Sequence, residues 1–318
     1  MTRNQRLVAL AALILLALVP AVVTDTYTRH IFIVAFIYGT VAVNWDLSLG
    51  LAGLFNFGHL AFFGIGVYTA AILTTALDIS PWLAIPAGGV TAAIAALVIA
   101  LPVAKLQGIY VVLVTFAFGQ LCMQVVLSQG DLTGGAEGLV RLPYLSIGDY
   151  AFIRDFRFAY YYVALGLLTV SVISLLLLAH SPFGKSLRAV RDNPDYAAAR
   201  GISVARQRVL VLVASAVFTG IAGGFYAIYL RVASPEVFGF SVATLILSMV
   251  LIGGAGSILG PVFAALALTF ATEAMAGTRG LEEARFIIVA AAMITVLRIA
   301  PSGAINIFSR FLTSGRKT

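Results

Sequence analysis

The chain has 318 residues, of which 61% are hydrophobic and only 10% are charged, with a formal net charge of +7. Soluble globular proteins carry about 25% charged residues and disordered chains have low hydrophobicity, so this composition excludes both classes. It also leaves too few polar residues for the lumen face of a membrane β-barrel. We therefore expect an all-α polytopic integral membrane protein.

Apolar segments follow one another along almost the whole chain, and a helical span needs about 20 such residues. The first segment, residues 7–23, follows Arg3 and Arg6 as in a signal peptide. No small-residue cleavage site follows it, so we expect an uncleaved helix. The other nine predicted spans are residues 30–45, 57–77, 81–104, 108–127, 158–179, 209–229, 241–253, 258–276 and 286–300. The sequence thus predicts about ten transmembrane helices.

Two of the predicted spans are interrupted by glycine, proline and polar residues. They read NWDLSLGLAGLFNFGH over residues 44–59 and LIGGAGSILGP over residues 251–261. Irregular backbone at membrane depth is tolerated only beside protein or a water-filled cavity, and paired interruptions mark transport sites between inverted repeats. We therefore expect a duplicated core with two broken helices. The alternative is that the glycines only allow close helix packing, as in Gly220-x-x-x-Gly224.

Basic residues are concentrated in the segments that would face the cytoplasm if the N-terminus is inside. These segments are residues 1–6, the turn at Lys105, the loop 180–208 and the chain from Arg298. The positive charge therefore indicates topology, with both termini cytoplasmic, and no nucleic-acid partner is expected. The single membrane domain would comprise a first helix and outer turn (1–29), a first half (30–127), an external loop (128–157), a linking helix (158–179), a cytoplasmic coupling loop (180–208), a second half (209–300) and a cytoplasmic tail (301–318).

The cytoplasmic loop contains the signals of a short separate helix. Asn193 can cap it, Pro194 suits its first position, and Asp195 suits the positive end of its dipole. Gly201 is placed to end it in a left-handed conformation. We predict a docking helix that fits a groove on a cytoplasmic partner. The alternative is a basic loop that faces lipid headgroups and only sets topology.

Several polar residues in or beside the membrane segments are candidates for a translocation pathway. Asn56 and His59 lie in the first interrupted span, and Gln120 and Gln124 share one helix face. The glycines after Thr133 could offer backbone amides to a solute carboxylate. The full set is Asn44, Asn56, His59, Gln120, Gln124, Thr133, Gly134 and Gly135. Hydrogen bonds that only join helices, and a plain surface turn, are the alternatives.

The sequence contains no convincing catalytic or metal site. Cys122 is the single cysteine, and the three histidines lack the spacing of metal ligands. Gly184-Lys185-Ser186 looks like the end of a P-loop, but Ala179 stands where that motif needs glycine. We therefore expect no catalytic residue, no metal and no cofactor on this chain.

The cytoplasmic loop resembles the Glu-Ala-Ala loop of permeases from ATP-binding-cassette importers. Asp195, Ala197, Ala198 and Gly201 match its spacing, although Asp replaces Glu, Tyr196 occupies the first alanine position and the distal proline is absent. Together with NWDLSLGLAGLFNFGHLAFFGIGVYTAA, LTGGAEGL, SPFGKSLRAVRDNPDYAAARGI and GGAGSILGP, it makes residues 30–300 similar to branched-chain amino acid permeases of the Liv type, M subunit.

This resemblance implies a multi-pass permease of the bacterial inner membrane without an ATPase site of its own. The implied partners are a second homologous permease, two cytoplasmic ATPases that bind ATP and Mg, a periplasmic substrate-binding protein and the lipid bilayer. Residues of the coupling loop would contact the ATPases, namely Phe183, Gly184, Arg188, Arg191, Asn193, Pro194, Asp195, Ala197, Ala198 and Gly201.

The solute is less defined than the transport class. The resemblance favours import of leucine, isoleucine and valine, and importers of urea or short amides share the same pattern. A different class, an ion-driven secondary transporter, would need several acids within the membrane, and only Asp46 and Glu273 qualify.

Overall fold

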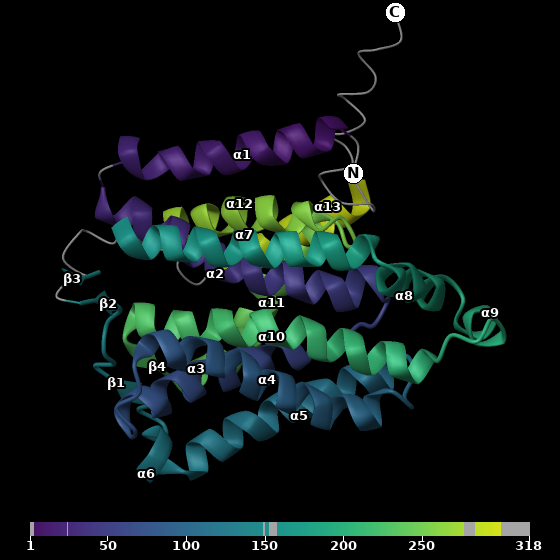
Figure 1. Ribbon diagram of the computed structural model, residues 1–318, viewed down its shortest axis with the longest axis horizontal. Helices are drawn as coiled ribbons and strands as arrows, with labels where there is room; N and C mark the ends of the chain where they lie inside the picture. The colour runs from purple at the N-terminus through teal and green to yellow at the C-terminus, as the bar shows by residue number, and fades with distance from the viewer. Residues whose placement is uncertain (1–2, 24, 149, 153–157, 277–283, 300–318) are drawn as a thin grey trace, which may run out of the picture.

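The computed structural model describes residues 3–23, 25–148, 150–152, 158–276 and 284–299, and the predicted tail 301–318 lies outside them. Within this part of the chain six helical spans are long and apolar enough to cross a membrane, and shorter apolar helices accompany them. Figure 1 shows these helices side by side in one bundle, with α1 at one edge and α5 near the opposite edge. The polytopic all-α fold is therefore confirmed, whereas the count of ten passes and the cytoplasmic termini stay predictions.

Each apolar segment that the sequence marked forms a helix. The six long spans are α2 (Thr26–Asp46) continued by the π-helix η1 (Leu47–Leu51), α3 (Gly58–Thr75), α4 (Pro81–Val103), α5 (Ile109–Ser128), α7 (Phe158–His180) and α10 (Val204–Leu230). The other apolar helices are α1 (Arg3–Val22), α11 (Phe240–Gly253), α12 (Leu259–Ala276) and α13 (Ala284–Ile299).

Short elements lie at the two ends of the bundle (Figure 1). One end carries α8 (Pro182–Asp192) and α9 (Pro194–Ala199) from the predicted cytoplasmic loop. The opposite end carries α6 (Gly130–Thr133), the 3-10 helix η2 (Pro235–Phe238) and the strands β1 (Leu139–Val140), β2 (Ser146–Ile147), β3 (Tyr150–Ala151) and β4 (Val232–Ala233). β1 pairs antiparallel with β4, and β2 with β3. The predicted external loop thus forms a β-pair with the segment that follows α10.

Glycines bring α3, α4 and α10 into close contact. A β-carbon on Gly66 would overlap the carbonyl of Gly220, and one on Gly220 would overlap the carbonyl of Gly88. Small residues at such crossings let helix backbones approach and gain van der Waals contact, which is what drives helix association in lipid. The close packing expected as the alternative role of the Gly220 region is therefore present, in addition to the broken helices.

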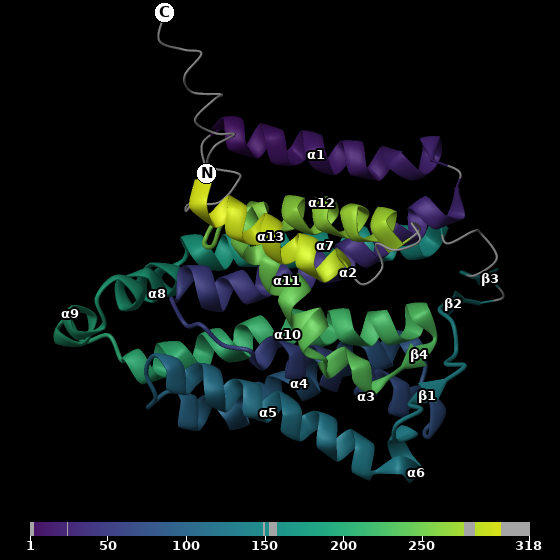
Figure 2. The same ribbon diagram turned by 180° about the vertical axis from the view of Figure 1, so that it is seen from behind.

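The contacts between helices repeat in the two halves of the chain. α10 packs mainly on α4 and α3 of the first half, and α2 packs on α12 and α11 of the second half. Within the halves, α3 contacts α4 and α5, and α11 contacts α12 and α13. α2 ends and α10 begins at the end that carries α8 and α9, so the two run in opposite directions (Figures 1 and 2). An inverted duplication predicts this pattern.

The two interrupted segments do not occupy equivalent positions in that repeat. The first lies between α2 and α3, the first two helices of its half, and the second between α11 and α12, the second and third helices of its half. Both lie at the same end of the bundle and contact each other, because the amide of Gly256 donates to Asp46. This corrects our expectation that they are the paired interruptions of an inverted repeat.

Candidate functional site

The first interrupted segment is held by a buried network around Asn56. The side-chain amide of Asn56 donates to Ser48 Oγ and to the carbonyl of Leu54, both at 3.0 Å. Its Oδ1 accepts from the amide of Gly58 at 3.2 Å and faces His59 Nδ1 at 3.1 Å. Polar groups buried in this way need partners to offset their loss of hydration. Asn56 therefore supplies partners to the Leu54 carbonyl and the Gly58 amide, on either side of its own position in the non-helical stretch.

His59 and Asn44 are also fully buried, and each keeps one polar atom without a partner among the described residues. The ring of His59 stacks on that of Trp45 with centroids 5.3 Å apart, and its Nε2 is the unpartnered atom. Asn44 donates to the carbonyl of Thr40 and to Ser171 Oγ, both at 2.7 Å, which leaves its Oδ1 unpaired. The structure thus groups Asn56 with His59, and it gives both of them and Asn44 packing contacts. Their pathway role stays a prediction.

The second interrupted segment is held by Asp46, a residue of the first half. Asp46 Oδ1 accepts from the amide of Gly256 at 2.6 Å, and Oδ2 accepts from the amide of Ile258 at 3.1 Å. Asp46 is fully buried. Gly50, one turn further on, touches Gly256 so closely that a β-carbon would overlap its nitrogen. Sequence reasoning noted Asp46 only as an acid in the membrane and missed this contact.

The predicted cytoplasmic loop forms two helices where the sequence predicted one. Ser181 caps α8 by accepting from the amide of Gly184 at 3.3 Å, and Pro182 follows as a favourable first residue. Gly184, Leu187 and Val190 form the buried face of α8. At its last turn Arg191 Nη1 donates to the carbonyl of Gly50 at 2.8 Å. α8 is therefore joined directly to the first interrupted segment.

The capping predicted for α9 is confirmed. Asn193 Oδ1 accepts from the amide of Tyr196 at 2.9 Å. Gly201 has φ +84°, its amide donates to Ala198, and the amide of Ile202 donates to Ala197. This pair of bonds is a Schellman motif, in which a left-handed glycine ends the helix. α9 protrudes from the end of the bundle (Figure 2).

The predicted ATPase-coupling residues divide into an exposed and an inward set. Gly184 and Ala197 are buried within the chain's own fold, and a β-carbon on Gly184 would overlap the last carbonyls of α7. These two can support a docking surface but cannot form it. Phe183 and Arg188 are partly buried. The exposed residues are Arg191, Asn193, Pro194, Asp195, Ala198 and Gly201.

The glycine-rich turn at the other end of the bundle already uses its amides. The amide of Gly134 donates to the carbonyl of Gly130 at 2.9 Å, and that of Gly135 to Thr133 Oγ1 at 3.3 Å. Thr133 is buried and donates to the carbonyl of Val126. These bonds favour the surface-turn alternative over a site for a solute carboxylate.

Gln120 and Gln124 lie on an exposed face of α5. Neither side chain makes a hydrogen bond to a residue that the structure describes. Only 22% of the residues in the apolar window of α5 are buried, which is the lowest share among the six long spans. Unsatisfied amides are unfavourable in hydrocarbon. This face therefore requires either a protein partner or water.

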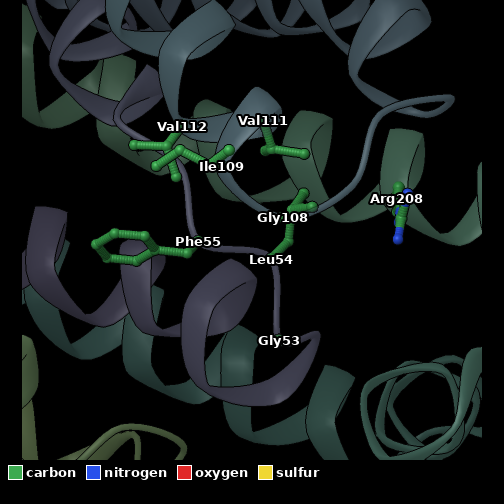
Figure 3. Close-up of a pocket in the computed structure, with 8 residues that line it drawn as sticks. All are labelled: Gly53, Leu54, Phe55, Gly108, Ile109, Val111, Val112 and Arg208. Atoms are coloured by element: carbon green, nitrogen blue, oxygen red, sulfur yellow. The ribbon is translucent and has the colours of Figure 1, made fainter.

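A cavity of about 330 Å³ opens between the first interrupted segment and the start of α5 (Figure 3). Leu54 and Phe55 line one side, and Ile109, Val111 and Val112 line the other. Arg208 of α10 lies at its rim and donates to the carbonyl of Leu106 at 2.6 Å. This cavity is at the end of the bundle that carries α8 and α9, and sequence reasoning did not foresee it.

Relatives of this chain are membrane permeases. LivM of Escherichia coli, a high-affinity branched-chain amino acid transport system permease protein, is 28% identical over 95% of this chain and 75% of its own length. LivH of the same organism is 26% identical over 84% of this chain and 90% of its own length. NupQ of Bacillus subtilis, a guanosine ABC transporter permease protein, is 23% identical over 55% of this chain and 59% of its own length. No solved structure matches the chain significantly.

The family model described as the permease component of branched-chain amino acid transport systems matches residues 27–297. That range includes both interrupted segments, α8 and α9, and all the long spans except the first residue of α2. The chain belongs to this family of branched-chain amino acid transport permeases.

Proposed function

We propose that the chain is the membrane-spanning subunit of an ATP-driven importer that moves leucine, isoleucine and valine from a periplasmic binding protein into the cytoplasm. Its partners are a second permease related to LivH, two ATPases that hold ATP and Mg, and the binding protein. The chain itself binds no nucleotide. Membership of the permease family carries this proposal, because both LivM and LivH are named for branched-chain amino acid transport.

The geometry of α8 and α9 supports coupling to a cytoplasmic ATPase. α9 is capped by Asn193 at its start and by Gly201 at its end, and it protrudes from the bundle. The helix is therefore already formed before a partner binds. The exposed Ala198 offers a small side chain on its surface, while the buried Ala197 anchors it to the permease. A helix that is already ordered loses little conformational entropy when it binds in a groove.

The other solutes and the other class of transporter are each less well supported than import of branched-chain amino acids. The names of LivM and LivH favour branched-chain amino acids over urea and short amides. The ion-driven transporter is disfavoured, because Asp46 holds a backbone turn and Glu273 accepts an exposed hydrogen bond from Tyr27. Neither acid is arranged as a free proton or sodium carrier.

Reconstitution into liposomes tests the proposal. The chain, its companion permease, the two ATPases and the leucine-loaded binding protein should together give leucine uptake that requires ATP inside the vesicles. Vesicles that contain only the two permeases serve as the control and should show no uptake. Leucine uptake by the permeases alone under a proton or sodium gradient would overturn the proposal. Competition by isoleucine and valine, but not by urea or acetamide, should confirm the solute class.

A further inference from the structure

The end of α8 reaches the point where the two interrupted segments meet. Arg191 Nη1 donates to the carbonyl of Gly50 in the π-helix η1 at 2.8 Å. The stem of the same side chain packs on Gly53, which has φ +66°. The other side of its guanidinium pairs with the exposed Asp192 at 2.9 Å, and exposed pairs of this kind contribute little. The bond to Gly50 is therefore the specific contact of Arg191.

Gly50 in turn contacts the second interrupted segment, so it connects that segment to Arg191. Its backbone lies against Gly256, and a β-carbon on Gly50 would overlap Gly256 N and Asp46 Oδ1. Because neither glycine has a side chain, the two backbones touch directly, with no side-chain atoms between them that could move aside. A displacement of the Gly50 carbonyl therefore moves residue 256 as well.

Asp46, the last residue of α2, fixes the same junction. Its two carboxylate oxygens accept from the amides of Gly256 and Ile258. Ile258 has φ +56°, a conformation that is unfavourable for a β-branched residue. Such strain persists only where surrounding contacts hold it, and it is common at elements that switch. The turn between α11 and α12 is thus held in a high-energy form by a group from α2.

We propose that Arg191 is the residue that transmits motion of the docking region to the transport pathway. When the ATPases displace α8 and α9, Arg191 displaces the Gly50 carbonyl to which it is hydrogen-bonded. Because Gly50, Gly256 and Asp46 are in contact, the two interrupted segments then move together. The cavity lined by Leu54 and Phe55 lies directly beyond Gly53, so this movement changes access from the cytoplasmic side. This inference rests on the proposed function and adds the route by which the two ends are coupled.

Uptake per ATP hydrolysed is the quantity that this role controls. In the reconstituted complex, the activity of Arg191→Ala is expressed as leucine uptake per ATP hydrolysed, so that any loss of ATPase binding through this exposed residue does not enter the ratio. Its leucine uptake per ATP should fall by about tenfold or more, the range of typical coupling between two sites. Arg191→Lys should recover part of the loss, because an ammonium can reach a carbonyl with one donor. Arg206→Ala removes an equal charge from an exposed position near the start of α10 and should behave as wild type.

Labelling of a cysteine in the cavity separates transmission from general loss of structure. In a Cys122→Ser background, Phe55→Cys should react with a maleimide at a rate that changes when ATP and vanadate lock the ATPases closed. With Arg191→Ala added, the rate should no longer respond, while the melting temperature of the complex stays close to that of the parent. A wild-type uptake ratio, or an unchanged labelling response, in Arg191→Ala would overturn the role of Arg191. Failure of the unmutated chain to retain ATPases would instead overturn the proposed function.

Discussion

Aspartates hold both ends of α2, but they do so over very different distances. At the start of α2, Asp25 is exposed and accepts from the amide and hydroxyl of Thr28, three residues away, at 2.8 and 2.7 Å. At the last residue of α2, Asp46 is fully buried and accepts from Gly256 and Ile258, more than 200 residues away. The same chemistry is a local cap in one place and a tertiary anchor in the other. Changes at the Asp46 end of α2 should therefore be far more damaging than changes at the Asp25 end.

Filling the contact at Gly50 should have the largest effect. Gly50→Val places carbon atoms where the nitrogen of Gly256 and the carboxylate of Asp46 now lie, and backbone cannot move aside as a side chain can. We expect a loss of about 4 kcal/mol or more, in the range seen only for severe core disruption. The yield of monodisperse protein and its melting temperature in detergent measure this.

Gly166 provides the matched control for that substitution. It lies on an exposed face of α7, and a β-carbon there would meet no other atom within 4 Å. Gly166→Val should change stability by less than about 1 kcal/mol, since it alters only helix propensity. Equal melting temperatures for the Gly50 and Gly166 variants would show that the junction is not tightly packed.

Weakening the anchor at Asp46 should have the next largest effect. Asp46→Asn keeps one acceptor and turns an NH₂ group towards a backbone amide, so one buried N–H loses its partner at a cost of about 1–3 kcal/mol. Asp46→Leu removes both acceptors and should cost more. Thermal unfolding of the purified permease measures the difference. Glu273→Gln, at a partly buried acid whose hydrogen bond from Tyr27 Oη is exposed, should shift it by less than about 1 kcal/mol.

Substitutions in the Asn56 network should have the third largest effect on stability. They also distinguish a structural role of these residues from a role in the translocation pathway. Asn56→Leu removes four hydrogen bonds from the first interrupted segment, whereas His59→Leu removes one. We expect Asn56→Leu to destabilise the permease by about 2 kcal/mol and His59→Leu by less. Leucine uptake that falls in His59→Leu at near-normal melting temperature would support a pathway role for His59. Unchanged uptake would leave it a packing residue.

The sequence predicted the local features of this fold closely because they depend on short segments. The predicted span 158–179 became α7 (Phe158–His180), and 81–104 became α4 (Pro81–Val103). The end of α9 at Gly201 was predicted from one residue, since glycine accepts a left-handed conformation without strain. In each case the apolar length or the capping residue lies within the element itself.

The long-range features could not be predicted from one sequence. The glycines of both interrupted segments suggested irregular backbone, but their pattern does not say that Gly50 meets Gly256. Arg191 is one of several basic residues in the predicted cytoplasmic loop, and the positive-inside rule accounts for all of them equally well. Only the packing of α8 against η1 selects Arg191 for the Gly50 carbonyl.

The Asp25 end of α2 should give the smallest effect, and this effect should depend on pH. The hydroxyl of Thr28, followed by its backbone amide, holds the pKa of Asp25 below its ordinary value. A carboxylate with a lowered folded-state pKa stabilises the protein above its unfolded value of about 3.9, and this contribution is lost as pH falls through the folded value. Asparagine caps helices about as well but does not titrate. Wild type should therefore lose more melting temperature than Asp25→Asn as pH falls from about 6 to below the unfolded value of about 3.9, so that the gap between the two narrows. A gap that stays constant over this range would contradict a titrating cap and would remove the contrast between the two ends of α2.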